Sequence, residues 1–567
     1  MFEITFLSKL RETQQHNTFV KDIMNKKLEF DFIILGAGSA GCVLANELSA
    51  DSSCRVLLLE AGPLDKNLFI HMPAGVYRVF RERSLNWNYF SANENALHER
   101  SIFTPRGRVV GGSSSINSMV YMRGHRFDYD GWAEDFDLPE WRFDKCLPYF
   151  IQGENYKSAR NPWRGNAGRL AVKQACSSDP LFDSFLEAGT QSGQGRSDDL
   201  NGVNPEGLAR LDCTILDGKR CSSATAHLRP ALGRANLTLI TMAESRKIIL
   251  NGGKAQGVVF THSDETIKAF AGQEVLLCAG AINSPALLMK SGIGPAAHLK
   301  DCDIPFRLHL PGVGKNLQDH AKIRLQFASK KRLPFHDIGR VSSKLKNGLT
   351  WLLTRRGMAA SNIWEVGGLI RSRPGVSYAN LQYHFGPLGF TVSDGKINVE
   401  QAFSLNVDQM RPKSTGSVLL DRADIHRSPI IAFQYMHHPH DLVEMVDAVK
   451  KARELVSQSA FDGLRGAEMK PGDQFQTDQE ITDMLRGSIE TAYHPSCTCP
   501  MGSDDRAVTD SQFQVHGIKG LRVIDASAMP RIVSANLNAP VQMMAARAAD
   551  FILKRKPLEP LDLQYSV

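Results

Sequence analysis

The chain has 567 residues, 42% of them hydrophobic, so it is long enough to bury large cores in about two to four domains. Its net charge of +7 is a small excess of 67 basic over 60 acidic residues mixed along the sequence, which argues against a nucleic-acid partner. Glycines interrupt the longest apolar runs before they reach the ~20 residues of a membrane span, so no transmembrane helix is predicted. Peripheral contact with an anionic membrane surface stays open.

The first 30 residues do not have the pattern of an export signal. They lack a long apolar core and a small-residue cleavage site, and their acidic side chains also argue against a transit peptide. We therefore expect an N-terminal extension over 1–30, in a protein that is not secreted and lies in the cytoplasm or on the inner face of the membrane. In such a compartment the 10 cysteines are expected to stay reduced.

A buried strand, a glycine turn, a helix and a second strand are predicted over residues 30–62, FDFIILGAGSAGCVLANELSADSSCRVLLLEAG. Gly36, Gly38 and Gly41 match G-x-G-x-x-G, in which glycines permit the tight turn, the approach of a pyrophosphate and the packing of the helix on the strand. Glu60 ends the second strand, where a carboxylate can bind ribose hydroxyls. This unit predicts a dinucleotide site and leaves NAD and FAD as alternatives.

Two further stretches carry small and polar residues at turns. The first is RGRVVGGSSSINSMVYMRG, residues 106–124, whose backbone N–H groups, hydroxyls and small side chains suit a polar ligand with a flat ring. The second is EVLLCAGAINSPALLMKSGIGP, residues 274–295, which predicts a buried strand, a turn and a helix. Taken alone, one would be an ordinary loop and the other an ordinary α/β crossover.

Together with the C-terminal stretch over 520–552, these segments resemble the glucose-methanol-choline (GMC) family of FAD-dependent oxidoreductases. The resemblance covers residues 30–553, and the two internal stretches are similar to the two signature patterns of that family. Four segments resemble its choline dehydrogenases: DDLNG (198–202), ASNIWEVGGLIRS (360–372), LQYHFGP (381–387) and ETAYHPSCTCPMG (490–502). The resemblance implies an α/β fold with a Rossmann-like FAD-binding domain and a second, α+β substrate-binding domain built on an antiparallel sheet.

The segments that resemble FAD-binding parts lie far apart in the sequence, so the domains are expected to be discontinuous. The expected division is an N-terminal extension over 1–30, an FAD-binding region over 31–320 interrupted by substrate-domain segments at about 76–99 and 126–199, a substrate-binding region over 321–484, a C-terminal return to the FAD domain over 485–556, and a tail over 557–567. The active site is expected where the two domains meet over the flavin.

The resemblance implies FAD as a noncovalent cofactor. The residues expected to bind it, from its ADP half to its ring, are Gly36, Gly38, Gly41, Glu60, Gly112, Ser113, Asn117, Met119, Val120, Asp525, Ala526 and Asn538. Some family members carry a histidine in the serine-rich loop that bonds covalently to the flavin. Ile116 occupies that position here, so no such bond is expected.

Alcohol oxidation requires a base for the hydroxyl proton and a group that orients the substrate, while the cofactor supplies the hydride chemistry. A neutral imidazole suits this role at neutral pH, and the sequence offers 17 histidines. The family pattern points to His494, with an asparagine partner that can hydrogen-bond the substrate oxygen without competing for its proton. The resemblance favours Asn536 as that partner, because it has the spacing to Asp550 that the family pattern implies, and Asn538 stays an alternative.

Choline carries a fixed positive charge that cannot donate a hydrogen bond, so a site for it needs aromatic faces and a carboxylate. The segment NIWEVGG resembles the one that carries the ammonium-binding glutamate of choline-oxidising members, which suggests Glu365 for this role. The alternative is an ordinary strand with one core residue and one solvated residue. The residues expected to bind the substrate are Glu365, Trp364, Tyr493, Tyr77 and His384.

The resulting hypothesis is an FAD-dependent oxidation of choline to betaine aldehyde, with a further step to glycine betaine left open. Either a quinone or oxygen could accept the electrons. One alternative keeps the fold and changes the substrate to another primary alcohol, aliphatic or aromatic. Another, from a different class, is a non-enzymatic FAD-fold binding protein.

No metal site is predicted. The histidines of HHPH, residues 437–440, lack a second ligand pair at a recognised spacing. The Cys-x-Cys of Cys497 and Cys499 also lacks such a pair, and it is not the Cys-x-x-Cys of a thiol oxidoreductase. We expect these two cysteines to pack around His494.

Overall fold

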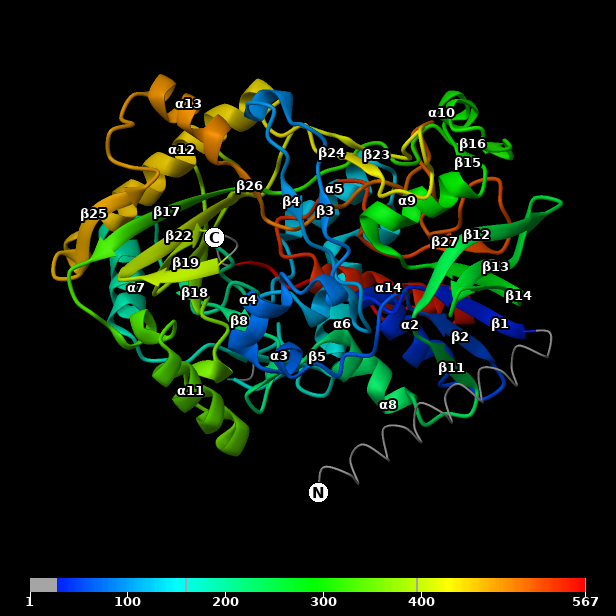
Figure 1. The fold of residues 1–567 in the computed structure, drawn as a ribbon, viewed down its shortest axis with the longest axis horizontal. Coiled ribbons are helices and arrows are strands. Elements are labelled where there is room, and N and C mark those ends of the chain that lie inside the picture. The colour runs from blue at the N-terminus through cyan, green and yellow to red at the C-terminus, as the bar shows by residue number, and fades with distance from the viewer. Residues whose placement is uncertain (1–27, 159–160, 394–395, 566–567) are drawn as a thin grey trace.

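The structure is a computed structural model that describes residues 28–158, 161–393 and 396–565. Two seven-stranded sheets lie toward opposite ends of the molecule, with loops and short helices between them (Figure 1). Of the predicted extension over 1–30, residues 1–27 lie outside the described part of the chain, and the remainder already belongs to the first strand.

The first sheet is mostly parallel and follows the order β11-β2-β1-β14-β13-β12, with β27 paired to β14. Its parallel strands are β1 (Leu28–Leu35), β2 (Val56–Leu59), β11 (Leu237–Ile240), β14 (Glu265–Leu277) and β27 (Leu521–Val523). Its antiparallel strands are β12 (Ala243–Asn251) and β13 (Lys254–His262). The apolar end of β1, Phe32 to Leu35, is buried throughout, as expected for a strand covered on both faces.

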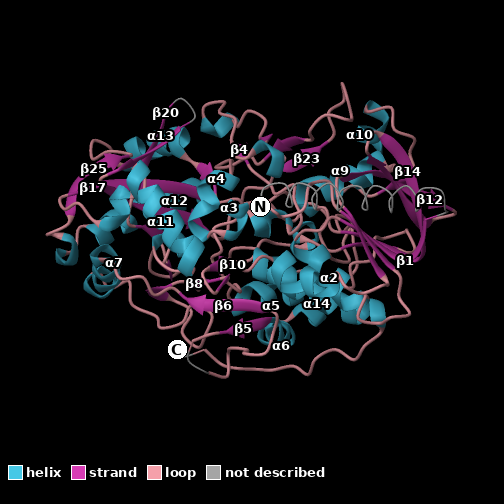
Figure 2. Cartoon of the chain, turned by 60° about the horizontal axis from the view of Figure 1, so that its bottom comes forward, coloured by secondary structure: helices cyan, strands magenta, loops and turns pink. Residues whose placement is uncertain are grey.

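Helices cover both faces of this sheet. On one face α2 (Ser39–Leu48) packs against α14 (Asn538–Leu553), although the two come from opposite ends of the chain (Figure 2). On the other face α9 (Gly280–Lys290) shares an apolar core with β1 and β2. The N-terminus of α2 follows the carboxyl end of β1 directly, so the predicted strand–turn–helix–strand unit is present and presents its turn at the edge where ligands bind.

The second sheet is antiparallel and follows the order β25-β17-β22-β19-β18-β7, with β26 paired to β17. Its strands are β7 (Gly207–Arg210), β17 (Ala321–Ser329), β18 (Val366–Ile370), β19 (Leu381–Gly386), β22 (Ala402–Gln409), β25 (Arg465–Lys470) and β26 (Glu490–Thr491). Its apolar core is shared with α7 (Pro180–Gln191), α12 (Pro439–Val456) and α13 (Asp478–Ser488). The predicted α+β domain on an antiparallel sheet is confirmed.

Shorter elements connect the two sheets. The remaining helices are α3 (Leu68–His71), α4 (Val76–Val79), α5 (Arg126–Asp135), α6 (Phe143–Gly153), α8 (Arg229–Ala231), α10 (Ala296–Asp301) and α11 (Val341–Thr354). The remaining strands are β3 (Tyr89–Phe90), β4 (Phe103–Thr104), β5 (Glu154–Tyr156), β6 (Leu170–Gln174), β8 (Asp212–Cys213), β9 (Ile215–Leu216), β10 (Lys219–Arg220), β15 (Ile293–Gly294), β16 (Leu308–His309), β20 (Gly389–Ser393), β21 (Lys396–Glu400), β23 (Ser417–Leu419) and β24 (Ile430–Ala432). Across the described ranges, no helix has both the length and the apolar character needed to cross a bilayer.

The chain passes between the two halves more often than the predicted boundaries imply. β7 lies inside the region predicted to bind FAD, yet it pairs with β18 in the antiparallel sheet. β26 lies inside the predicted C-terminal return, yet it pairs with β17 of the same sheet. Both strands are too short for a hydrophobic period to reveal the sheet they join. The two halves therefore share segments along the line where they meet.

Candidate active site

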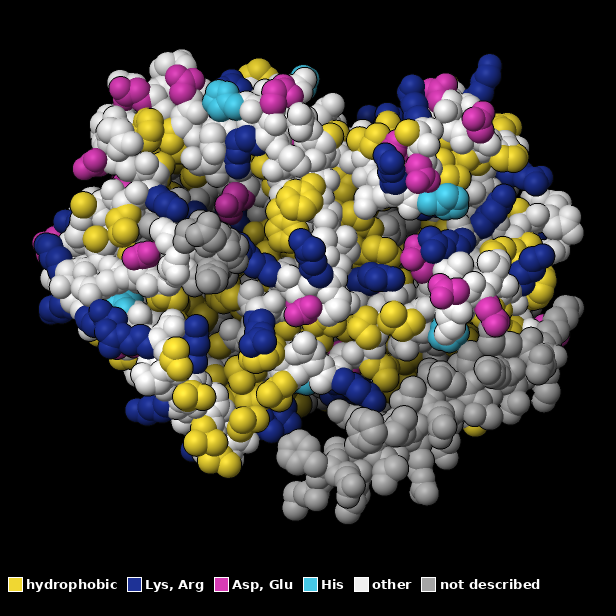
Figure 3. Space-filling model, in the orientation of Figure 1, with side chains coloured by type: hydrophobic (Ala, Val, Ile, Leu, Met, Phe, Trp, Pro, Cys, Tyr) yellow, Lys and Arg dark blue, Asp and Glu magenta, His cyan; other side chains and the backbone are white. Residues whose placement is uncertain are grey.

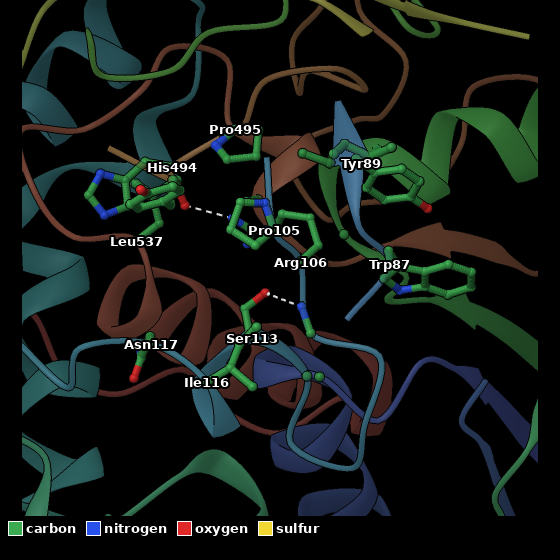
Figure 4. A pocket seen from close by; sticks show the side chains of 18 of the residues that line it. Trp87, Tyr89, Pro105, Arg106, Ser113, Ile116, Asn117, His494, Pro495 and Leu537 are labelled. Atoms are coloured by element: carbon green, nitrogen blue, oxygen red, sulfur yellow. Dashed lines mark hydrogen bonds between the residues drawn. The ribbon is translucent and has the colours of Figure 1, made fainter. Parts of the chain in front are cut away.

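A cavity of about 640 Å³ lies where the two halves meet. Its wall combines the first glycine turn, the serine-rich loop (residues 106–124), the start of α9, strands β17 and β22, and the segment after β27. Figure 4 shows part of this cavity, with His494 across the opening from Ser113, Ile116 and Asn117 of the serine-rich loop. The location agrees with the general placement of ligand sites at the carboxyl ends of parallel strands.

One end of the cavity has the features of a dinucleotide site. Gly36 has a φ of +107°, and a Cβ at Gly41 would stand 1.9 Å from the Gly36 carbonyl oxygen, so only glycine lets α2 come this close to the turn. The Glu60 carboxylate accepts hydrogen bonds from two backbone N–H groups, each at 2.9 Å, which hold it at the end of β2. Burial raises the pKa of Glu60 to about 7. Gly36, Gly38 and Glu60 line the cavity, and Gly41 supports the turn from behind.

The serine-rich loop lies directly against this turn. Gly112 has a φ of +54°, and a Cβ there would stand 2.8 Å from the Cα of Gly38. The buried guanidinium of Arg220 donates to the backbone and side-chain oxygens of Asn117 at 2.6 and 2.7 Å, which fixes the loop from the far side. The predicted cofactor residues of this loop all line the cavity: Gly112, Ser113, Asn117, Met119 and Val120.

The segment after β27 closes the cavity beside α9. Asp525 accepts hydrogen bonds from the backbone N–H of Gly280 at 2.8 Å and from the hydroxyl of Ser284 at 2.6 Å. The hydroxyl of Ser39 donates to Oδ1 of Asn538 at 2.8 Å, where α2 and α14 both begin. Three more predicted cofactor residues thus line the cavity: Asp525, Ala526 and Asn538.

Both ring nitrogens of His494 have hydrogen-bond partners. Nδ2 of Asn536 donates to Nε2 of His494 at 3.1 Å, and the Nδ1 atoms of His494 and His320 lie 2.9 Å apart. Gln382 donates to Oδ1 of Asn536 at 3.1 Å, so the amide turns its NH₂ group toward His494. His494 therefore carries its proton on Nδ1, and its Nε2 accepts the hydrogen bond of Asn536 at the wall of the cavity. Asn536, rather than Asn538, is the asparagine beside His494.

The backbone on each side of the His494 ring is held in place. Oδ1 of Asp319 accepts a hydrogen bond from the His494 N–H at 2.6 Å, and Nη1 of Arg106 donates to the carbonyl oxygen of Tyr493 at 2.6 Å. Tyr493 has a φ of +70°, which costs about 1–3 kcal/mol for a residue with a side chain. These hydrogen bonds offset that cost and keep the imidazole aimed at the cavity.

Burial keeps the His494 imidazole neutral. It is the largest cause that lowers the pKa of His494 well below 6.5, followed by repulsion from His320 when that ring is protonated and from other basic groups nearby. Burial likewise lowers the pKa of His320 to about 4. At neutral pH both rings are uncharged, so Nε2 of His494 has a lone pair, bonded here to the Asn536 amide, that can accept the proton of an alcohol.

Four predicted substrate-side residues line the cavity: Tyr77, Trp364, His384 and Tyr493. The prediction for Glu365 needs correction, because its side chain lies away from the cavity. Its carboxylate accepts hydrogen bonds from the backbone and hydroxyl of Ser177, at 2.8 and 2.6 Å, and from the hydroxyl of Ser361. Ser177 and Ser361, which hold the carboxylate, do not line the cavity, whereas the neighbouring Trp364 does.

Two cations on β17 that were not predicted also line the cavity, Lys322 and Arg324. The Lys322 ammonium, in a side chain that is 6% exposed, lies 3.3 Å from Oε2 of Glu490 and 4.6 Å from the ring centre of Tyr493. Arg324 lies 3.4 Å from the same oxygen of Glu490. Burial opposes the charge of Lys322, but Tyr493 and Glu490 outweigh it and raise the Lys322 pKa. Two cations therefore share one carboxylate at this wall.

The stretches considered as metal ligands have structural contacts instead. Nδ1 of His438 accepts a hydrogen bond from the backbone N–H of His440 at 3.2 Å, at the first turn of α12. Cys497 and Cys499 are fully buried as free thiols, and burial raises the pKa of Cys497 to about 12. Within the part of the chain that the structure describes, no three His, Cys, Asp or Glu side chains gather as metal ligands would.

Comparison with known families matches two GMC oxidoreductase models to this chain. The N-terminal model covers residues 30–322 and the C-terminal model covers residues 412–545, which together are more than half of the sequence. The chain belongs to the GMC oxidoreductase family. The first model ends at Lys322, at the start of β17, and the second spans the segments that carry His494 and Asn536.

Individual proteins agree with this GMC assignment. An oxygen-dependent choline dehydrogenase of Pseudomonas aeruginosa (strain LESB58) is 42% identical over 545 residues, 95% of this chain and 97% of the relative. Its namesake in Burkholderia pseudomallei (strain 1710b) is 43% identical over 543 residues, 95% of this chain and 96% of the relative. The structure of pyridoxine 4-oxidase from Mesorbium loti, 29% identical, matches 93% of this chain and 100% of its own with a TM-score of 0.83. A formate oxidase, 24% identical, shares the fold with a TM-score of 0.86 over 93% of this chain and 98% of its own.

As a GMC oxidoreductase, the protein is an FAD-dependent oxidoreductase that acts on CH–OH donors. The cavity fits FAD, because a glycine turn that a Cβ would fill lies next to a carboxylate at the ribose position. The glycine turn and Glu60 would hold the ADP half, and the serine-rich loop would hold the ring. The side chain that faces the cavity at Ile116 is apolar and has no atom that can bond to a flavin, which agrees with noncovalent binding.

Substitution of Gly41 tests the glycine turn. Gly41→Ala places a methyl group against the Gly36 carbonyl, so we predict that the purified protein carries less FAD and loses about 1–3 kcal/mol of stability. Flavin absorbance per chain and thermal unfolding measure the two effects. Gly233→Ala is the matched control, because no atom lies within 4 Å of a Cβ there. Equal behaviour of the two variants would contradict the role of Gly41.

The low pKa of His494 predicts an unusual pH dependence. A group whose pKa is lowered stays unprotonated at pH values where an ordinary histidine is charged, so the base is retained as the medium is acidified. We predict that anaerobic reduction of the bound flavin by an alcohol keeps its rate as the pH falls from about 8 to about 6. Stopped-flow absorbance measures this rate. A midpoint of loss near 6.5 would show that His494 titrates as an exposed histidine does.

Proposed function

We propose that this GMC oxidoreductase oxidises choline to betaine aldehyde, with His494 as the base and Asn536 as its partner. The observation that carries alcohol oxidation is the neutral His494 ring, which presents Nε2 to the cavity beside Nδ2 of Asn536. Choline is the substrate in the names of relatives that are 42% and 43% identical over 95% of this chain. The rings of Tyr77, Trp364 and Tyr493 supply faces that attract a quaternary ammonium group.

The contacts assign each residue a part in the reaction. Nε2 of His494 accepts the hydroxyl proton, while Nδ2 of Asn536 donates to the oxygen as it becomes negative. The Nδ1–H of His494 stays bonded to His320, which keeps the ring oriented while it carries the additional proton. FAD, held by the glycine turn and the serine-rich loop, would supply the two-electron chemistry as acceptor of the substrate's hydride.

The same groups serve a second oxidation. An aldehyde hydrate presents an O–H and a C–H on one carbon, as the alcohol does, so His494 and Asn536 can act on it in the same way. The further product would be glycine betaine, and its formation requires no residue beyond those already in place.

The proposal also includes an electron acceptor and a cellular location for the enzyme. Oxygen is the proposed electron acceptor, because the names of the relatives describe them as oxygen-dependent, and a quinone is the alternative. The proposed location is the cytoplasm or the inner face of the membrane, with peripheral contact to that membrane.

A different substrate class has one specific observation in its favour. The cavity wall places Lys322 and Arg324 beside Glu490, with Asp408 opposite Lys322, while Glu365 is bound by two serines outside the cavity. A cation at this wall repels a quaternary ammonium and attracts a carboxylate. The second candidate is therefore another primary alcohol, either uncharged or with an anionic group.

Replacement of the proposed base tests the reaction. His494→Ala should keep its bound FAD and slow anaerobic flavin reduction by choline about 10²- to 10⁴-fold, because the proton acceptor is lost. Stopped-flow absorbance gives the rate, and His437→Ala, an exposed histidine outside the cavity, is the control. Reduction by choline at the wild-type rate would remove His494 from the mechanism. A wild-type flavin that no alcohol reduces would favour a non-enzymatic FAD-fold protein.

Removal of the Lys322 charge discriminates between the two substrate classes. Lys322→Gln should lower the KM for choline and raise the KM for an alcohol of similar size with a carboxylate, each by up to about tenfold. Steady-state assays with choline, the anionic alcohol and an uncharged analogue give these values. Glu365→Gln is the matched control, since the side chain does not line the cavity, and it should alter all three substrates alike. A selective loss of choline binding in Glu365→Gln would restore the original role predicted for Glu365.

A further inference from the structure

Helix α11 has an apolar stripe that faces solvent. Its members are three or four positions apart up to Leu352 and end with the adjacent Leu353, which places them on one side of the helix, and they are 46–76% exposed: Val341, Leu345, Leu349, Leu352 and Leu353. The opposite side holds Trp351, the one buried residue of α11, whose Nε1 donates to the carbonyl oxygen of Gly218 at 2.7 Å. The helix is therefore attached to the body by one aromatic anchor, with its apolar side turned outward.

Positive charge surrounds this stripe. Lys344 and Lys346 lie along its two opposite edges, given the 100° that each helical residue turns, and both are exposed. Residues 330–356 contain eight basic side chains and one acidic, a local excess equal to the net charge of +7 of the entire chain. The acidic one, Asp337, is already paired with Arg332 and Arg340, and no acidic residue occurs over 338–364.

The position of α11 leaves the stripe accessible. Figure 1 shows the helix projecting at the edge of the molecule, and Figure 3 shows its hydrophobic side chains gathered there with Lys and Arg beside them. The hairpin of β9 and β10 lies under the anchor and adds exposed Leu216 and Lys219 to the same region. A leucine stripe edged by lysines is the pattern of a helix that lies in the interface of a membrane.

We infer that α11 docks this enzyme on an anionic lipid surface, with the stripe inserted among the acyl chains and the basic rim against the headgroups. The inference rests on the membrane contact proposed above and identifies the surface that makes it. An anionic bilayer fits better than a second copy of the chain, because two copies of α11 would bring like charges together at every edge of the contact.

Vesicle sedimentation of the FAD-loaded enzyme tests this inference. We expect binding to phosphatidylcholine vesicles that contain phosphatidylglycerol, weaker binding at high salt, and little binding to phosphatidylcholine alone. The variant Leu345→Ser/Leu349→Ser/Leu353→Ser should reduce binding at least about tenfold. The matched control Val203→Ser/Leu232→Ser/Phe306→Ser, which removes exposed apolar residues elsewhere, should bind as the wild type does.

The emission of a dye attached to α11 reports whether the stripe enters the bilayer. Cys176 is the exposed one among the ten free cysteines, so Cys176→Ser/Leu349→Cys can carry a single environment-sensitive dye. Its emission should shift to the blue when anionic vesicles are added. A dye that does not respond, or equal binding of the two triple variants, would overturn the inference. A third result would also overturn it: light scattering shows a dimer, the α11 substitutions convert that dimer to a monomer, and none of the proteins binds vesicles.

Flavin reduction by an alcohol in solution distinguishes a failure of this inference from a failure of the proposed function. None of the substituted side chains lines the active-site cavity, so every variant should reduce its flavin with an alcohol at the wild-type rate. Loss of vesicle binding with intact flavin reduction therefore reports on α11 alone. Failure of choline to reduce any of the proteins would instead count against the proposed substrate.

Discussion

The contact between the backbones of Gly38 and Gly112 is the constraint on which the cavity depends. It joins the first glycine turn to the serine-rich loop at a distance that leaves no room for a side chain at position 112. The segments that form the cofactor end are arranged around this contact: Arg220 holds the loop from outside, and Asn538 of α14 bonds to Ser39 at the start of α2. Small residues allow the close approach, and larger polar groups keep it in place.

At the other end of the cavity, burial and charge act together on one imidazole. The environment that deprives His494 of water lowers its affinity for a proton, and Lys322 adds to the effect as a nearby cation. The same ammonium also faces any substrate that enters. The strength of the base and the charge preference of the site are therefore coupled through Lys322, so neither property can be altered at this position without the other.

Much of the fold and of the cofactor end could be predicted from the sequence, because local rules decide them. A strand, a turn and a helix follow one another directly around Gly36, and the position of Glu60 follows from the strand it ends. His320, Gln382 and Lys322 were not predicted as site residues, since each reaches the site only through the pairing of distant strands. Glu365 illustrates the reverse case: its neighbour Trp364 lines the cavity, while the serines that bond its carboxylate lie outside the cavity.

His494 lies between two sets of backbone hydrogen bonds that belong to different halves of the molecule. Four residues earlier the chain forms β26 against β17, and soon afterwards Cys497, Cys499 and Met501 pair with residues 526–528 beside the cofactor end. Because both halves are hydrogen-bonded to the same short segment, a rotation of one half relative to the other would displace His494. These hydrogen bonds oppose hinge motion between the halves. The base is in place only when both cores are folded, so the two cores behave as one cooperative unit.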